Sequence, residues 1–246
     1  MPEIIIGRNP VLEALRAGRT MARISLERSA RSDEKLAEIV RLANANHVAL
    51  DYVSREVLDA QTAHEVHQGV VALATPRPSP TLEDLATVSV RKGEAPLYVL
   101  LDGIEDPHNL GAILRTCEAA GVHGVIERSR RAVGLTPAAI KAAAGAAEYI
   151  PLVEVTNIAQ SIETLKKNNI WIVGVEGTAR ESYLNIDYRP PTAIVVGSEG
   201  QGISALVKKK CDFLASIPMR GKITSLNASV AAGVVLYEVL RQRTAQ

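Results

Sequence analysis

Aromatic side chains are scarce in this chain of 246 residues, which has six tyrosines, one tryptophan and one phenylalanine. Proteins that bind exposed single-stranded bases usually stack those bases on aromatic rings. With so few rings, stacking is a poor basis for nucleic-acid binding here, and contacts to phosphates and to overall shape are favoured instead.

Cysteines and long apolar runs are scarce as well. The two cysteines, Cys117 and Cys211, have neither a CxxC spacing nor paired histidines, which excludes a disulfide framework and predicts no metal site. No apolar run approaches the roughly 20 residues of a membrane span. The opening "MPEIIIGRNPVLEALRAG" lacks the basic segment and cleavage site of a signal peptide, so we expect a cytoplasmic protein.

No charge of either sign dominates, because 28 lysines and arginines face 27 acidic residues. Any binding to RNA must therefore use local patches. Candidate patches are "RSRR" at 128–131, "KKK" at 208–210, and the N-terminal arginines Arg8, Arg16, Arg19, Arg23, Arg28 and Arg31. Each patch alone is also typical of an ordinary solvated surface.

A proline-rich stretch, "TPRPSPTLEDL" at 75–85, divides the chain. We predict a small α/β domain over 1–75, a linker over 76–95 and a second domain over 96–246. In the first domain, the patterns indicate strands at 22–27, 47–53 and 69–74 and helices at 9–18, 32–46 and 54–61.

The second domain alternates near-continuous apolar strands with helices, a pattern typical of a parallel sheet covered on both faces. Strands are expected at 97–102, 121–127, 150–155, 170–177, 192–200 and 213–218, and helices at 109–120, 137–147, 157–169, near 204 and at 226–243. Ligands of such sheets bind beyond the carboxyl ends of the strands, so the loops there are the place to look for chemistry.

The first such loop leads into "DPHNLGAILRTCEAAG", 106–121. Asn109 is placed to cap the following helix. Arg115 points away from the helix's apolar stripe, and its neighbours Gly111, Ala112 and Ala119 are very small. Such a face leaves room for a large ligand, although an ordinary exposed arginine on an alanine-rich helix would give the same sequence pattern.

Two further loops carry polar residues. In "VVGSEGQGIS", 195–204, the glycines permit close backbone approach to a ligand and Glu199 is a plausible acceptor, but the spacing excludes a dinucleotide fingerprint. In "IPMRGKITSLNAS", 217–229, the Gly-Lys pair lacks the other residues of a phosphate-binding Walker loop. Ser225 or Asn227 could cap the helix that follows.

Taken in order, these three stretches resemble the three motifs of the SpoU branch of RNA 2′-O-ribose methyltransferases, in the SPOUT superfamily. The N-terminal "GRNPVLEAL" and "HQGVVA" resemble the substrate-binding domain of bacterial large-subunit rRNA guanosine-2′-O-methyltransferases, and "AEYIPLVEVTNIAQSI" and "NIWIVGVEG" fit the same proteins. The resemblance implies a parallel α/β domain with a deep trefoil knot, preceded by a small domain similar to ribosomal RNA-binding proteins of the L30 type.

The resemblance also implies a site. S-adenosylmethionine would lie between the second and third loops, lined by Gly197, Ile217 and Leu226, with Gly174, Glu199 and Met219 nearby. Arg115 would fix a phosphate and stabilise the developing alkoxide, since arginine is a poor proton acceptor. Together with Arg115, the residues Asn109, Glu199, Ser225 and Asn227 fill the catalytic positions. No metal is implied.

Partners follow from the same resemblance. It implies a homodimer acting on RNA, with a guanosine ribose in the peptidyl-transferase region of 23S rRNA as the expected target. Two alternatives stay open: another RNA, such as tRNA or the rRNA sites methylated by antibiotic-resistance enzymes, and a catalytically silent RNA-binding assembly factor.

Overall fold

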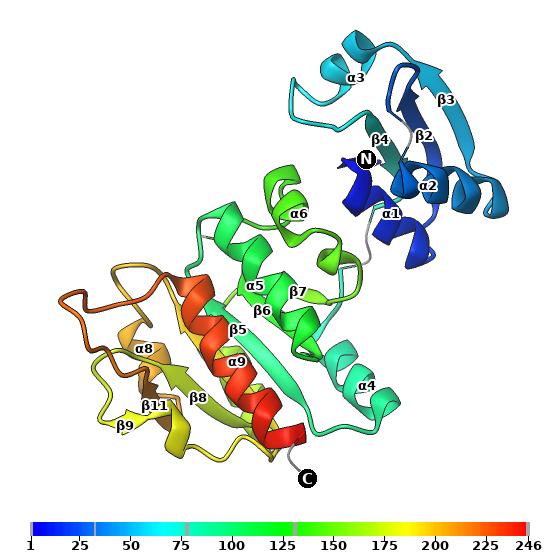
Figure 1. The fold of residues 1–246 in the computed structure, drawn as a ribbon. Coiled ribbons are helices and arrows are strands. Elements are labelled where there is room, and N and C mark those ends of the chain that lie inside the picture. Colours follow the sequence, from blue (N-terminus) through cyan, green and yellow to red (C-terminus); the bar gives the residue numbers. More distant parts are fainter. Residues whose placement is uncertain (1, 32, 77–78, 130–131, 245–246) are drawn as a thin grey trace. The chain divides into compact units, whose positions relative to one another are not determined.

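The computed structural model describes residues 2–31, 33–76, 79–129 and 132–244. The chain forms two compact units (Figure 1). The first unit comprises residues 1–78 and 135–149, and the second comprises residues 79–134 and 150–246. No helix in the described ranges has the length and apolar character needed to cross a membrane.

The first unit is built on a four-stranded sheet of order β1-β4-β2-β3. Only β2 and β3 run parallel, while β4 is antiparallel to both β1 and β2. Its core gathers buried aliphatic side chains from the sheet and from two helices, among them Ile5, Leu15, Ile24 and Ile39. The elements are β1 (Glu3–Ile6), α1 (Arg8–Arg16), β2 (Met21–Glu27), α2 (Glu34–Ala45), β3 (Ala49–Val53), α3 (Arg55–Gln61) and β4 (Val70–Ala74).

Two parts of this unit were not assigned to it from the sequence. The strand β1 was not expected, because "EIII" is a short apolar run without alternation. The segment 135–149, which contains α6 (Pro137–Ala143) and η1 (Ala146–Glu148), belongs to this unit although it lies far along the chain. Arg19 pairs there with Glu148, an ion pair whose two partners are nearly buried.

The second unit holds a seven-stranded sheet of order β7-β6-β5-β10-β8-β11-β9, in which every neighbouring pair is parallel. This confirms the parallel α/β sheet expected from the apolar strands. The strands are β5 (Leu97–Asp102), β6 (Gly124–Arg128), β7 (Leu152–Val155), β8 (Trp171–Val175), β9 (Glu181–Ser182), β10 (Thr192–Gly197) and β11 (Phe213–Ser216). The trefoil knot remains a prediction.

Helices cover both faces of this sheet. On one face α5 (Pro107–Ala119) and α9 (Ala228–Thr244) lie side by side (Figure 1), with Thr116 against Gly233. On the other face α4 (Leu82–Lys92), α7 (Ile158–Lys167) and α8 (Ala205–Lys208) share one apolar core with the sheet. The short η2 (Tyr183–Asn185) follows β9.

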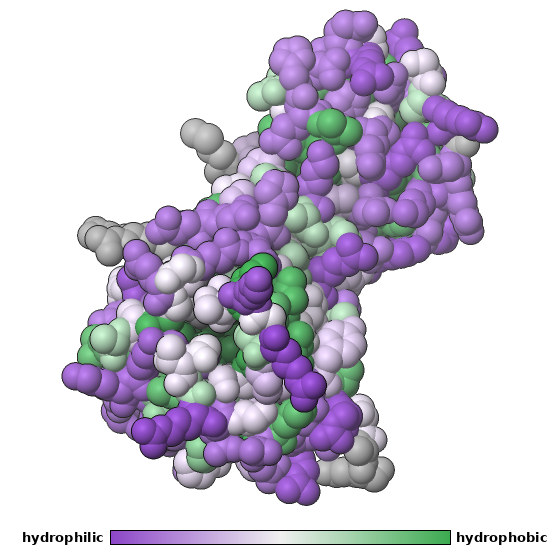
Figure 2. All heavy atoms as spheres, turned by 60° about the vertical axis from the view of Figure 1, so that its left-hand side comes forward, coloured by the Kyte–Doolittle hydropathy of each residue, from purple (hydrophilic) through white to green (hydrophobic). Residues whose placement is uncertain are grey.

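The two units differ in surface character. In Figure 2 the first unit, at the top, is mostly hydrophilic, whereas green apolar patches interrupt the charged surface of the second unit. Exposed apolar residues of the second unit include Met219, Ile223, Leu226, Val230 and Tyr237. Four of these five belong to the third loop or to the first turn of α9, while other exposed apolar residues, such as Trp171, Leu184 and Phe213, lie elsewhere, so only part of the apolar exposure adjoins the candidate site.

The segment 76–95, which we expected to be a linker, contains the regular helix α4. A capping box between Thr81 and Asp84 starts this helix, and Gly93 in the left-handed conformation ends it. Leu85 is fully buried and packs so tightly on β6 that a Cβ on Gly124 would lie 2.4 Å from its Cδ2. This part of the segment is therefore a structural layer of the second unit, while residues 77 and 78 lie outside the described residues.

We predict that Leu85→Ala destabilises the protein by about 2–5 kcal/mol, because it opens a cavity where the helix meets the sheet. Val90→Ala on the same helix is the matched control, since Val90 is 77% exposed and surface changes usually stay within about 0.5 kcal/mol. Calorimetric unfolding measures both. Equal melting temperatures for the two variants would show that α4 is not part of the core.

Candidate active site

A cleft of about 1110 Å³ opens at the carboxyl ends of β8, β10 and β11. Its walls come from three segments: residues 175–178 after β8, residues 196–202 after β10, and the third loop with the start of α9, up to Ala231. The second and third polar loops predicted from the sequence thus face each other across one cleft. This is the location that a parallel sheet predicts for a ligand.

Three side chains from distant parts of the chain meet at the edge of this cleft. Asn109 Nδ2 donates to Glu199 Oε1 at 3.0 Å, and Asn227 Nδ2 donates to Asn109 Oδ1 at 2.9 Å and also to Glu199 Oε1. We call these three residues the amide–carboxylate junction. Both amides engage Oε1, so Glu199 Oε2 remains free, within the described residues, to accept a hydrogen bond from a substrate.

The helix caps differ in one case from the expectation. Helix α5 begins at Pro107, two residues earlier than predicted, and its N-cap is Asp106, whose Oδ1 accepts from His108 N at 2.9 Å. Asn109 is therefore not the cap, and its buried side chain is free to join the junction. Asn227 does cap α9, because its Oδ1 accepts from Ser229 N at 3.0 Å and from Val230 N.

The loop that carries Glu199 is held by a buried carboxylate that our sequence analysis missed. Asp102, at the end of β5, accepts from Ser204 N and from Arg128 Nη2, both at 2.8 Å. A hydrogen bond from Gly202 N to Ser198 O closes the loop between these points. The sequence did contain one signal for Asp102: it is an acidic residue directly at the carboxyl end of a buried strand.

Glycines at the site serve packing. A Cβ on Gly197 would lie 2.1–2.3 Å from backbone atoms of Gly202 and Ile203, so only glycine allows the second loop to fold back on its own strand. Gly197 lines the cleft, whereas Gly174 is not among the lining residues. A Cβ on Gly174 would instead meet Leu214, Cys211 and Ile203, which makes it a core-packing position.

The apolar residues predicted to hold the donor do line the cleft. Ile217, Met219 and Leu226 come from the third loop, and Ile223 joins them although the sequence did not single it out. Ser225 lies on the same wall and is exposed. These side chains form an apolar wall that a flat ring system could cover.

Glu176 is a second carboxylate in the cleft that the sequence analysis did not single out, although it follows β8 as Asp102 follows β5. Its Oε2 pairs with Lys208 Nζ at 2.6 Å. Partial burial acts to raise the pKa of Glu176, but hydrogen bonds from Lys208 and Thr178 outweigh it and hold the pKa below its usual range. An ionised acceptor is thus available there.

Arg115 lies apart from these groups. It is exposed on α5, does not line the cleft, and makes no hydrogen bond or ion pair with the described residues. Of its small neighbours, Gly111 is buried, Ala112 is half-buried and Ala119 is exposed. The structure therefore presents a free guanidinium beside small residues, outside the cleft that would hold the donor.

The basic patches are largely neutralised. Arg8, Arg16, Arg19 and Arg23 pair with carboxylates, and Arg28 donates to the Tyr52 carbonyl. Of the six N-terminal arginines, Arg31 alone has a guanidinium without a partner among the described residues. In the lysine run, Lys208 and Lys210 are paired with Glu176 and Glu163, which leaves Lys209. Arg128 binds Asp102, and Arg130 and Arg131 lie outside the described residues.

No cluster of three potential metal ligands occurs among the residues that the structure describes. The site therefore offers amides, hydroxyls and carboxylates together with an apolar wall. This composition suits an organic ligand.

Comparisons with known proteins agree with this geometry. The model of the SpoU rRNA Methylase family matches residues 96–237, and that of the RNA 2′-O ribose methyltransferase substrate-binding domain matches residues 4–80. A protein of Bacillus subtilis (strain 168), named as a TrmH family tRNA/rRNA methyltransferase, is 44% identical over 98% of this chain and 96% of its own length.

Two solved structures are similar throughout. The SpoU methyltransferase AviRb from Streptomyces viridochromogenes, in complex with the cofactor AdoMet, has a TM-score of 0.83 at 26% identity and covers 100% of this chain and 92% of its own. An AdoMet-bound rRNA methyltransferase from Sinorhizobium meliloti has a TM-score of 0.80 at 26% identity, covering 98% and 87%. Both matches extend over the two units.

We expect substitutions of Asn227 to separate its two roles. Asn227→Ala removes the cap of α9 and also the two hydrogen bonds that Asn227 donates in the junction. Loss of the cap costs about 0.5–2 kcal/mol. Asn227→Ser keeps a capping hydroxyl but has no amide donor, so it should restore the melting temperature and still lose about ten-fold or more in turnover, the scale of a hydrogen bond to a charged group. Full activity in Asn227→Ser would mean that the junction is only structural.

Two of the glycines that line the cleft, Gly197 and Gly177, allow a second test. Gly197→Ala should distort the second loop, at a cost typical of overpacking, about 1–3 kcal/mol, and should weaken ligand binding in the cleft. A Cβ on Gly177 would meet only the Thr224 carbonyl at 3.8 Å, so Gly177→Ala should bind normally. Titration calorimetry with S-adenosylmethionine measures both, and normal affinity in Gly197→Ala would contradict the packing argument.

Proposed function

Because the chain belongs to the SpoU/TrmH family of RNA 2′-O-ribose methyltransferases, we propose that its target is a guanosine ribose in the peptidyl-transferase region of 23S rRNA. The amide–carboxylate junction beside the donor cleft is the observation that supports catalysis. The match of the N-terminal residues to a substrate-binding domain supports a structured RNA as the substrate, and so does the likeness to an rRNA methyltransferase over both units. A silent RNA-binding factor would have no use for this junction.

The methyl donor is S-adenosylmethionine, and the cleft fits it. Its volume and its apolar wall of Ile217, Met219 and Leu226 suit an adenine ring, while backbone groups around Gly197 can approach closely. The ionised Glu176 can accept hydrogen bonds from the donor's hydroxyl or ammonium groups. When bound, the donor supplies an electrophilic methyl group on sulfur.

The protein's own task is to orient the ribose and to remove the 2′-hydroxyl proton. In our proposal the junction holds Glu199 so that its Oε2 faces the substrate and accepts that proton, or passes the role to a neighbouring phosphate. Arg115 binds an RNA phosphate and stabilises the developing alkoxide. Ser225 assists by hydrogen bonding to the ribose.

We further propose that the enzyme works as a homodimer through the outer faces of α5 and α9. Val230 and Tyr237 are about half exposed and stand two helical turns apart on α9, so they form one apolar stripe. Arg115 lies on the adjacent helix α5. A partner docked on this surface would bring a second chain close to Arg115, which lies outside the donor cleft of its own chain.

Transfer of labelled methyl from S-adenosylmethionine to unmodified rRNA tests the function. Arg115→Ala should lower the rate by about 10²–10³, the usual effect of removing a charge-stabilising donor. Donor affinity should be unchanged, because Arg115 does not line the cleft. Arg91→Ala, an exposed arginine on α4, is the control.

Mapping the modified nucleotide identifies the substrate. A single 2′-O-methylguanosine in the peptidyl-transferase region is the expected result. Methylation of tRNA but not of rRNA would overturn the substrate assignment and keep the chemistry. Donor binding without methylation of any RNA would overturn catalysis itself.

A further inference from the structure

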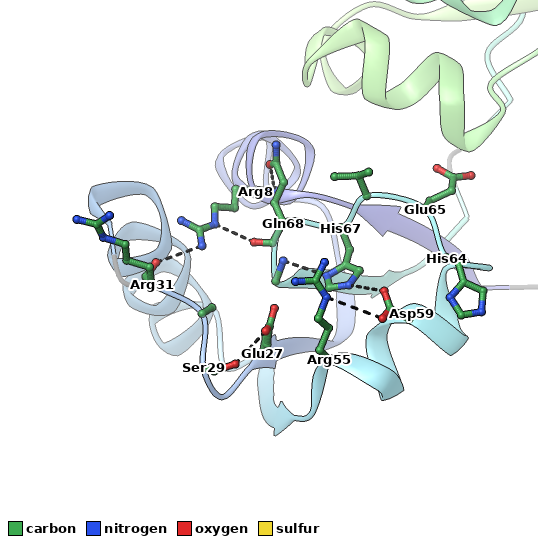
Figure 3. A pocket seen from close by; sticks show the side chains of 13 residues that line it. Arg8, Glu27, Ser29, Arg31, Arg55, Asp59, His64, Glu65, His67 and Gln68 are labelled. Carbon is green, nitrogen blue, oxygen red and sulfur yellow. Dashed lines mark hydrogen bonds and ion pairs between the residues drawn. The ribbon is translucent and has the colours of Figure 1, made fainter.

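The first unit contains a pocket of about 430 Å³ that the methyl-transfer chemistry does not use. It lies between the end of β2, the start of α3 and the loop 64–69 that precedes β4 (Figure 3). Its lining combines three guanidinium groups, from Arg8, Arg31 and Arg55, with three carboxylates, from Glu27, Asp59 and Glu65. Its charge is therefore balanced, and it is not a simple anion trap.

Some of these groups are fixed by each other and form the walls. The buried His67 ring accepts from Gly69 N at its Nδ1, so its Nε2 carries the proton and donates to Asp59 Oδ1, each at 3.0 Å. Arg8 Nε donates to the Gln68 carbonyl at 3.0 Å, and Arg8 also pairs with Asp33. Figure 3 shows the Arg8–Gln68 and His67–Asp59 bonds among the residues that line the pocket.

Other groups are left with unused hydrogen-bonding capacity. Glu27 accepts from Ser29 at its Oε1 only, and its Oε2 has no partner within the described residues. The Gln68 amide nitrogen and the Arg31 guanidinium are likewise unpartnered within those residues, and Arg55 is 3.9 Å from Asp59, beyond hydrogen-bonding distance. Donors and an acceptor thus border the same small space.

The loop beside these groups is held in an uncommon backbone conformation. Ala63, His64 and Gln68 all have positive φ although none is glycine. Such residues cost of order 1–3 kcal/mol each and cluster at ligand sites. At Gly69 a side chain would meet Ala30 at 3.0 Å, so the close approach of the loop to β2 depends on glycine. The pocket is preformed at a cost in stability.

We propose that this pocket binds one unpaired nucleotide of the RNA substrate, with guanine preferred, an inference that rests on the proposed function. The half-buried carboxylate of Glu27 can accept N–H donors from a ligand, and guanine presents two adjacent ones on its Watson–Crick edge. Arg31 and Arg55, which both line the pocket, bind the flanking phosphates.

Guanine is preferred for a physical reason. Uracil offers a single N–H between two carbonyl oxygens, and those oxygens would face the Glu27 carboxylate. Adenine and cytosine each offer one amino group beside an unprotonated ring nitrogen, which repels the second carboxylate oxygen. RNA-binding proteins read splayed-out bases by these edges. Stacking is not needed, which agrees with the scarcity of aromatic residues.

The test uses the full chain with its donor cleft saturated by S-adenosylhomocysteine, so that nucleosides cannot bind there. Binding of the four ribonucleoside 5′-monophosphates is followed by NMR through the amide signals of Gln68 and Gly69. We expect GMP to bind most tightly, and Glu27→Gln to reduce the preference for GMP by about ten-fold, within the range of a bidentate base contact. Arg55→Ala should weaken all four nucleotides equally.

Matched controls lie on the same unit outside the pocket. Glu34→Gln and Arg23→Ala remove exposed charges from α2 and β2 and should leave the GMP preference unchanged. Equal melting temperatures for Glu27→Gln and the native chain exclude misfolding as the cause. If the native chain shows no shift at Gln68 and Gly69 with any nucleotide, or if Glu27→Gln keeps the preference, the proposal is wrong.

Measurements of methyl transfer distinguish a failure of this proposal from a failure of the proposed function. Glu27→Gln should raise the KM for rRNA and leave both kcat and donor affinity near their native values. If the native chain methylates rRNA and Glu27→Gln has the native KM, the pocket proposal fails alone. If the native chain methylates no RNA, the proposed function fails, whatever the nucleotide titration shows.

Discussion

The amide–carboxylate junction is the contact on which the arrangement of the second unit's active face depends. Asn109, Glu199 and Asn227 come from the start of α5, the loop after β10 and the start of α9, and they share hydrogen bonds at one carboxylate oxygen. Since both amides act on Oε1, the other oxygen has no hydrogen-bond partner among the described residues. Asn227 also starts α9, so the same side chain fixes a helix and orients a carboxylate.

The sheet explains why these segments can meet. In a parallel sheet the carboxyl ends of all strands lie on one edge, and β5 and β10 are direct neighbours, which places Gly197 opposite Asp102. Asp102, at the end of β5, holds the loop after β10 by accepting a hydrogen bond from Ser204 N. It also accepts one from Arg128 at the end of β6, so the loop is tied to both strands. The buried strands supply stability, while the polar residues just past their ends line the cleft.

The sequence was informative where a pattern has one physical meaning. Apolar runs between helices predicted the parallel sheet, and polar residues after the strands predicted two walls of the cleft. The sequence misled where two residues could play the same local role. Asp106 and Asn109 can each cap a helix, so the pattern could not tell which of them begins α5. The prolines at 76–80 suggested a linker and so hid the helix that follows them. Ion pairs such as Arg19–Glu148 join residues far apart in the chain, so charge counts along the sequence could not reveal that most of the arginine patch is neutralised.

The separation of the junction residues along the chain has a consequence for synthesis on the ribosome. Asn109 emerges first, Glu199 much later, and Asn227 only at the start of α9. A nascent or truncated chain that ends before α9 already contains the whole strand and helix set of the first unit that precedes residue 75, but it lacks one donor to Glu199 and one wall of the cleft. Such a fragment would hold RNA-facing surface without a completed site, so the order of residues itself delays activity until α9 has been made.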